Sequence, residues 1–151
     1  MPEGGDHVTG RAPGKCLSTL ADAVAATGLR DGATISFHHH LRNGDAVINT
    51  VVDMLAEAGL RDLHLAVTSL FPVHAPLVAH IRSGVIGHIS ASFISGPVGE
   101  AISRGALATP VTLRSHGGRA RAIDTGEIPI DVAFVAAPAA DEMGNLSGRT
   151  G

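Results

Sequence analysis

The chain carries the tetrapeptide Gly-Leu-Arg-Asp twice, as Gly28-Leu-Arg-Asp31 and as Gly59-Leu-Arg-Asp62. Each copy stands between a stretch with the apolar spacing of a helix and a short strand-like run. The run is Ala33-Thr-Ile-Ser-Phe37 after the first copy and Leu63-His-Leu-Ala-Val67 after the second. Glycine suits the left-handed position that follows a helix, so each copy is predicted to turn a helix into a strand. The repeat therefore predicts helices and strands in alternation.

Four helices are predicted around these strands, from apolar residues spaced three and four apart. Proline in the first turn and glycine just past the last residue mark helix ends. The predicted helices run from Leu17 to Gly28, from Asp45 to Gly59, from Pro76 to Gly84 and from Pro97 to Gly105. The apolar face predicted for the second helix consists of Val47, Ile48, Val51, Met54, Leu55 and Ala58.

Five strands are predicted in all. The three that follow the repeat are Val85 to Ala91, Val111 to Ser115 and Asp131 to Ala136. Strands that alternate with helices are typical of a parallel sheet covered on both faces, so the fold class is α/β with a mostly parallel sheet flanked by helices. Ligands of such sheets bind beyond the carboxyl ends of the strands. The segments that follow strands are therefore where a site is expected.

Composition excludes several classes of function. The 151 residues are 44% hydrophobic and 17% charged, enough for one domain with a core. A formal charge of -3 and only 3% aromatic residues argue against a nucleic-acid partner. No apolar stretch approaches the roughly 20 residues that cross a bilayer, and the single Cys16 cannot form an internal disulfide. The sequence therefore predicts a cytoplasmic chain without a nucleic-acid or membrane partner.

Residues 1–15 have neither helical periodicity nor the apolar centre of a secretion signal. They are predicted to be a flexible tail. Residues 16–151 are predicted to form a single α/β domain. Three unusual segments of this domain follow predicted strands, and we expect them to meet at one edge of the sheet. They are residues 38–45, 116–121 and 138–148.

The first of these segments is His38-His-His-Leu-Arg-Asn-Gly-Asp45. It lies between a predicted strand and a helix N-terminus, where free N–H groups and the helix dipole favour a phosphate or carboxylate. Its single glycine does not give the G-x-G-x-x-G spacing of a dinucleotide loop, so a Rossmann cofactor site is rejected. The predicted ligand contacts here are His38, His39, His40, Arg42, Asn43 and Gly44.

The second segment is His116-Gly-Gly-Arg-Ala-Arg121, predicted to be a glycine turn. The glycines allow close approach of the backbone, and Arg119 and Arg121 present planar guanidinium groups that match a carboxylate or phosphate. Charge-assisted bonds of roughly 1.5 to 3 kcal/mol each would favour a polycarboxylate over acetate. The alternative is a turn with solvated arginines. The predicted contacts are His116, Gly117, Gly118, Arg119 and Arg121.

A metal-binding protein that uses His38, His40 and His116 is a further alternative. Neither a second cysteine nor an H-x-x-x-H pair completes a tetrahedral set, so no metal is predicted. Cys16 is expected to be an inert thiol. The remaining histidines within the predicted elements are expected to be structural, and these are His64, His74, His80 and His88.

Two stretches together resemble the alpha chains of bacterial citrate lyase, the citrate CoA-transferase subunits. They are Gly28 to Asp45, which includes the histidine triplet, and Arg114 to Ile123. Asp141-Glu-Met-Gly-Asn145 is similar to a D-x-x-G-N signature of CoA-transferases. The resemblance runs from about Leu17 to the last residue. It implies an α/β fold of the NagB/RpiA/CoA-transferase type, present here in part.

The resemblance implies that acetyl on an acyl-carrier-protein thioester is exchanged for citryl, with release of acetate. It also implies assembly with an acyl-carrier (gamma) chain and a lyase (beta) chain into an oligomer that binds citrate. The CoA-like pantetheine prosthetic group is carried by the acyl carrier protein, and no cofactor is expected on this chain.

Related CoA-transferases attack the thioester with a glutamate that lies in the later of two similar halves. We expect this chain to be part of the first half and to end before that residue, so its catalytic residue is unknown. Glu100, Glu127 and Glu142 are expected to be surface charges. Without the glutamate, a noncatalytic binding or assembly module is the alternative function.

Overall fold

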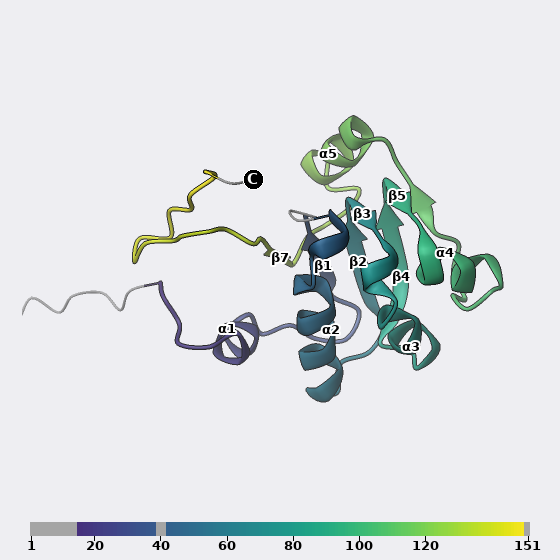
Figure 1. Ribbon diagram of the computed structural model, residues 1–151, viewed down its shortest axis with the longest axis horizontal. Coiled ribbons are helices and arrows are strands. Elements are labelled where there is room, and N and C mark those ends of the chain that lie inside the picture. The colour runs from purple at the N-terminus through teal and green to yellow at the C-terminus, as the bar shows by residue number, and fades with distance from the viewer. Residues whose placement is uncertain (1–14, 39–41, 150–151) are drawn as a thin grey trace, which may run out of the picture.

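A parallel sheet of five strands runs through the centre of the chain (Figure 1). The computed structural model describes residues 15–38 and 42–149. The strand order is β6-β4-β2-β1-β7, and every neighbouring pair is parallel. The strands are β1 (Thr34–Phe37), β2 (Leu63–Val67), β4 (Ile86–Ala91), β6 (Thr112–Leu113) and β7 (Val132–Phe134). The α/β class and the parallel sheet are confirmed.

Five helices and two short helical turns connect these strands. The helices are α1 (Leu20–Ala26), α2 (Val47–Glu57), α3 (Leu77–Arg82), α4 (Gly96–Ser103) and α5 (His116–Asp124). The turns are η1 (Arg42–Gly44) and η2 (Pro72–His74), and a second small sheet pairs β3 (Ser69–Leu70) with β5 (Phe93–Ile94). Among the described residues, no helix has the length and apolar composition that crossing a membrane requires.

The core lies between one face of the sheet and the helices α2, α3 and α4. Alternate residues of β2 point into it, because successive side chains of a strand face opposite sides. Leu63, Leu65 and Val67 are fully buried there. The opposite face of β2 carries Ala66, which packs against Ala122 of α5. Helices therefore contact both faces of the sheet, as the alternation of elements predicts.

The first helix differs from its prediction. It begins at Leu20 rather than Leu17, because the Thr19 hydroxyl caps it by accepting the N–H of Asp22. No residue of α1 is fully buried, Leu17 and Leu20 are exposed, and Val24 is partly buried against the core. The second helix buries Ile48, Val51, Val52 and Leu55 instead of the whole predicted face.

The segment around residue 115 also differs from its prediction. Only Thr112 and Leu113 of the predicted strand pair with β4, and the following residues 116–121 form the start of α5 instead of a glycine turn. The reason is local, since Ser115 is an N-cap whose hydroxyl accepts the N–H of Gly118 at 3.1 Å. The cap outweighs the poor helix propensity of the two glycines.

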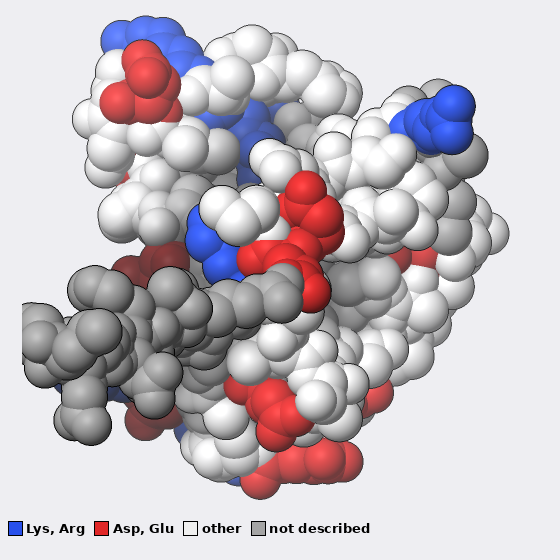
Figure 2. Space-filling model, turned by 90° about the vertical axis from the view of Figure 1, so that its left-hand side faces the viewer, with Lys and Arg blue, Asp and Glu red and all other residues white. Residues whose placement is uncertain are grey.

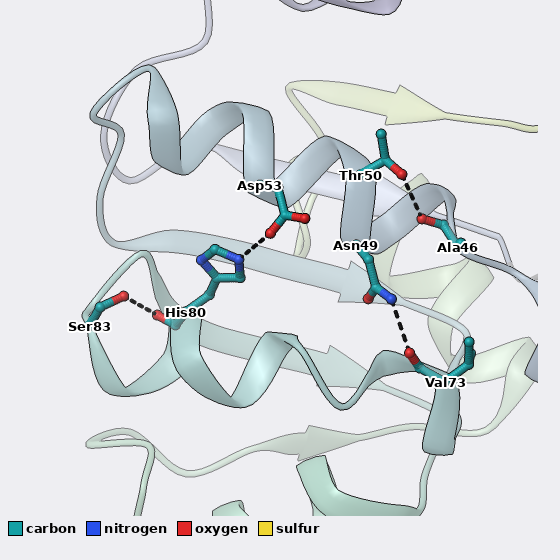
Figure 3. A network of polar contacts seen from close by, with 7 residues as sticks. All are labelled: Ala46, Asn49, Thr50, Asp53, Val73, His80 and Ser83. Carbon is teal, nitrogen blue, oxygen red and sulfur yellow. Dashed lines mark hydrogen bonds and ion pairs between the residues drawn. The ribbon is translucent and has the colours of Figure 1, made fainter.

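Polar contacts fasten α2 to the segment that follows β2 (Figure 3). The Asn49 side chain donates to the carbonyl of Val73 at 3.0 Å, and His80 Nε2 lies 2.6 Å from Asp53 Oδ1. Asp45, predicted as the start of this helix, caps it from one residue before the N-cap position by accepting the N–H of Val47. These contacts place the N-terminus of α2 at the carboxyl end of the sheet.

Candidate functional site

Arg119 joins α5 to the carboxyl ends of the two central strands. Its Nη2 donates to the hydroxyl of Ser36 on β1 at 2.8 Å and to the carbonyl of Ala66 on β2 at 3.2 Å. Ser36 stands two residues before His38, the first residue of the triplet. Figure 1 shows α5 above the ends of the strands. The structure therefore brings two of the three predicted segments, far apart in the sequence, to one edge of the sheet.

The charge of Arg119 is only half solvated and has no acidic partner in the described part of the chain. The ion pairs there join His80 to Asp53, His88 to Asp62, Arg104 to Glu100 and Arg114 to Glu127. Burial lowers the pKa of Arg119, although a guanidinium stays protonated. A partly buried cation without a counter-ion costs free energy, which an anionic ligand would recover.

The helical form of α5 separates the two predicted arginines. Residues two apart on a helix point about 200° apart, so Arg121 lies exposed while Arg119 faces the sheet. They do not form the joint clamp that a turn would have allowed. Residues three apart share a face, so His116 lies on the same side of α5 as Arg119. Gly117 and Gly118 lie in the first turn of α5, and the N–H of Gly118 donates to the capping hydroxyl of Ser115.

The net charge of the chain is -3. Figure 2 shows Lys and Arg side chains at the top of the molecule and in the hollow below, with Asp and Glu side chains beside them. Arg114 precedes α5 and pairs with Glu127 just after the helix, at 2.5 Å. This pair joins the segments that flank the two ends of α5, the helix that carries Arg119.

The described part of segment 38–45 is held in place by two side chains. Asn43 was predicted to bind ligand, and Asp45 was predicted to start the helix. Asn43 Oδ1 accepts the N–H of Val73 at 3.0 Å, so this oxygen holds the loop to η2. His38 and Gly44 are exposed. His39, His40 and the side chain of Arg42 lie outside the described residues.

The third predicted segment does not reach this edge. Residues 138–148 run away from the sheet (Figure 1) and lie against the N-terminal segment, where Lys15 N donates to the Glu142 carbonyl at 3.0 Å. The Asp141 carboxylate accepts hydrogen bonds from Asn145 and from the N–H of Met143, which lower its pKa. The D-x-x-G-N signature is thus a self-contained turn, and the prediction that all three segments meet is wrong.

Two residues of this region were not singled out from the sequence. Ser36 is a buried serine near the carboxyl end of β1, and such a polar residue just before the triplet is a usable signal. His74 is completely buried beside the histidine loop, and nothing in the sequence distinguishes it from the other histidines. His64 bonds Ser90 at 2.8 Å across two strands, a structural contact as predicted.

Hollows elsewhere on the surface do not contain the predicted residues. One of about 420 Å³ lies between α3 and α4, one of about 380 Å³ is lined by Gly28 and Asp131, and one of about 470 Å³ lies beside Gly96. Within residues 15–38 and 42–149 no three His, Cys, Asp or Glu side chains cluster as metal ligands would. His40, one of the three ligands of the metal alternative, lies outside that part.

We expect acid to destabilise the fold through two histidines. Burial, and then the charge of His88, lower the pKa of His64, and burial lowers that of His74 more than Asp45 raises it. The unfolded chain therefore takes up protons first, and stability is complete above about pH 6.5 and falls below it. Urea unfolding at pH 7.5 and pH 5 measures the loss, and His64→Gln should reduce it. Greater stability at pH 5 would contradict the expectation.

The fold is that of an α/β protein, and a guanidinium that has no acidic partner among the described residues lies at the carboxyl ends of its central strands. The chain belongs to the family described as "Citrate lyase, alpha subunit (CitF)", which matches residues 14–151. The resemblance seen in the sequence is thereby confirmed.

Relatives with this description extend well beyond the matched segment. The chain is 50% identical over 137 residues to the citrate lyase alpha chains of Escherichia coli K12 and Klebsiella pneumoniae, which is 91% of this chain and 27% of each relative. A crystal structure described as the alpha subunit of citrate lyase from Streptococcus mutans in complex with citrate superposes with a TM-score of 0.87 at 50% identity. That match covers 89% of this chain and 26% of the other. The chain thus spans about a quarter of the length of these relatives.

Proposed function

We propose that the chain takes part in citrate CoA-transfer, and that it supplies the end of the site that holds the carboxylates of citrate. In the reaction, citrate and an acetyl thioester of an acyl carrier protein give the citryl thioester and acetate. The pantetheine arm belongs to the carrier (gamma) chain, and a lyase (beta) chain cleaves the citryl thioester. The single cysteine supports a cytoplasmic place for this oligomeric assembly.

The observation that carries the proposal is the guanidinium of Arg119 at the carboxyl end of β1, which has no acidic partner within residues 15–38 and 42–149. Two of its contacts are already made to Ser36 and Ala66, which hold the group in one orientation and leave other N–H donors for a carboxylate. A citrate complex has been described for the Streptococcus mutans relative. A small carboxylate is therefore the ligand that best fits the charge.

His116 and His38 offer further hydrogen-bonding groups to a ligand with several carboxylates. His116 lies at the first position of α5, where helix N–H groups also favour an anion. His38 follows the strand that carries Ser36. A ligand with one carboxylate, such as acetate, contacts Arg119 alone, whereas citrate can contact Arg119 and the histidines with different carboxylates. This difference favours binding of citrate and release of acetate.

A noncatalytic binding module is the second candidate, and the positions of the glutamates favour it. Glu127 pairs with Arg114, Glu100 lies beside Arg104, and the backbone of Glu142 contacts Lys15. Each of the three is thus engaged elsewhere, and Arg119 has no carboxylate ion-pair partner in the described ranges. Such a chain could bind citrate without forming an acyl intermediate.

Calorimetry and an exchange assay on the same chain separate these functions. We expect citrate to bind at least about tenfold more tightly than acetate, since an added charge-assisted contact contributes about 1.5 to 3 kcal/mol. Transfer of labelled citrate onto an acetylated acyl carrier protein then tests catalysis. Binding with exchange supports the transferase, binding without exchange supports the module, and equal affinity for citrate and acetate contradicts both.

A further inference from the structure

The two acceptors that hold Arg119 are both uncharged. One is the hydroxyl of Ser36, 2.8 Å from Nη2, and the other is the carbonyl of Ala66, 3.2 Å from the same nitrogen. Ser36 and Ala66 are register partners on β1 and β2, which lie side by side in the sheet (Figure 1). Nη2 has two hydrogens, and these two contacts use both of them. The guanidinium is therefore fixed at one nitrogen, and the N–H groups of Nε and Nη1 remain for other partners.

Ser36 stands on the face of β1 that does not carry the core. Its neighbours Ile35 and Phe37 point into the core, whereas Ser36 points toward α5, because successive residues of a strand face opposite sides. Ser36 is itself only 8% exposed. A buried hydroxyl needs a hydrogen-bond partner, and Arg119 provides one. The contact therefore satisfies a buried polar group as well as holding the arginine.

The lack of charge on Ser36 matters as much as its contact. A carboxylate at this position could also bond the guanidinium, but it would neutralise it. A hydroxyl and a backbone carbonyl orient the group and leave its positive charge without a counter-ion within residues 15–38 and 42–149. A partly buried cation in that state gains more from an anionic ligand than a solvated cation does, because less water competes for it.

We propose that Ser36 is a positioning residue for Arg119, which orients the guanidinium with an uncharged acceptor and so leaves its charge to the carboxylates of the ligand. The inference rests on the proposed function. Ser36 acts through Arg119, and it needs no contact of its own with the ligand. Removal of the hydroxyl should weaken binding through loss of orientation, and a carboxylate in its place should weaken binding through loss of charge.

Ser36→Ala is expected to weaken citrate binding about fivefold to tenfold, the effect of one ordinary hydrogen bond. Ser90→Ala is the matched control, because Ser90 is also 8% exposed and is in register with Ala66 on the opposite neighbouring strand. Its hydroxyl also makes a hydrogen bond of 2.8 Å, but to His64 instead of Arg119. We expect S90A to bind citrate as the wild type does. Isothermal titration measures both affinities, and equal losses in S36A and S90A would overturn the inference.

A double-mutant cycle with Arg119→Gln shows whether Ser36 acts through Arg119. The glutamine does not reach Ser36, so S36A should cause no further loss of citrate affinity in the R119Q background. A serine with a merely structural role would cause the same loss in both backgrounds. That result would contradict a positioning role.

Ser36→Asp and Ser36→Asn separate charge from contact. The two side chains have the same size and both present an acceptor oxygen, but only the aspartate is charged. We expect S36D to bind citrate about 10- to 100-fold more weakly than S36N, because its carboxylate takes the place of the ligand at Arg119. Equal citrate affinities of the two variants would sink the inference. If urea unfolding shows that the sheet admits neither larger residue, S36A and its cycle decide the question.

A readout without ligand separates failure of this inference from failure of the proposed function. Rotation of the guanidinium about its Nε–Cζ bond can be measured from the nitrogen–hydrogen NMR signals of Arg119. We expect faster rotation in S36A, which loses one of the two acceptors, and the wild-type rate in S90A. Unchanged rotation in S36A would overturn the inference whether or not citrate binds. Lack of citrate binding by the wild-type chain would instead contradict the proposed function, and it is observed before any variant is made.

Discussion

Arg119→Gln is expected to weaken citrate binding by about 10- to 100-fold, because charge-assisted hydrogen bonds contribute about 1.5 to 3 kcal/mol and this cation has no acidic partner in the described chain. Glutamine is two atoms shorter and does not reach Ser36, but the Ser115 cap and the Arg114–Glu127 pair remain, so α5 should stay in place. Isothermal titration with citrate measures the loss.

Two further substitutions show whether charge or geometry is responsible. Arg119→Lys keeps the charge but loses the planar pair of donors, and we expect it to recover only part of the affinity. Arg61→Gln removes an exposed arginine whose Nη1 contacts only the adjacent Leu60 carbonyl, and it should bind as the wild type does. If R119Q and R61Q bind citrate equally well, the edge at Arg119 does not hold the ligand.

Leu65→Ala is expected to lower the free energy of unfolding by about 2 to 5 kcal/mol. Leu65 is 0% exposed on β2, the middle strand of the five, where it packs into the core between the sheet and the helices on one face. Truncation there removes apolar contact and leaves a cavity that rigid neighbours cannot fill. Urea unfolding followed by circular dichroism measures the change.

Leu113→Ala is the matched control for this truncation. The side chain is 63% exposed on β6, the short edge strand, so its loss should change the free energy of unfolding by less than about 0.5 kcal/mol. Equal effects of the two substitutions would mean that the core does not lie on the face of β2 that carries Leu65.

Most of the fold was predictable because its signals are local. The glycines that end helices at Gly28, Gly59, Gly84 and Gly105 all adopt positive φ, as the end signals require. The run Leu63–Val67 forms β2 over its full predicted length. The errors fall where a helix cap competes with a local pattern. Ser115 starts a helix in a glycine-rich segment, and Thr19 starts α1 three residues later than the apolar spacing predicts.

The candidate site was predictable in kind and not in detail. The residue types in segments 38–45 and 116–121 indicated an anion-binding site. The structure brings Arg119 of the second segment to β1, the strand that precedes the first segment. The sequence did not distinguish Arg119 from Arg121, since their difference in direction exists only once α5 is helical. Asn43 was predicted to bind ligand, yet its oxygen is used by Val73.

The sequence alone determined the alternation of elements, the parallel sheet and the family, because each depends on spacing and residue type along the chain. Only the tertiary structure decided that Arg119, and not Arg121, faces the sheet and has no acidic partner among the described residues, and that His74 is buried. The reason is physical. Burial of Arg119 and of His74 depends on α5 and η2 being folded against the sheet, and the cost of burying a charge or a ring nitrogen is a property of that packed surrounding.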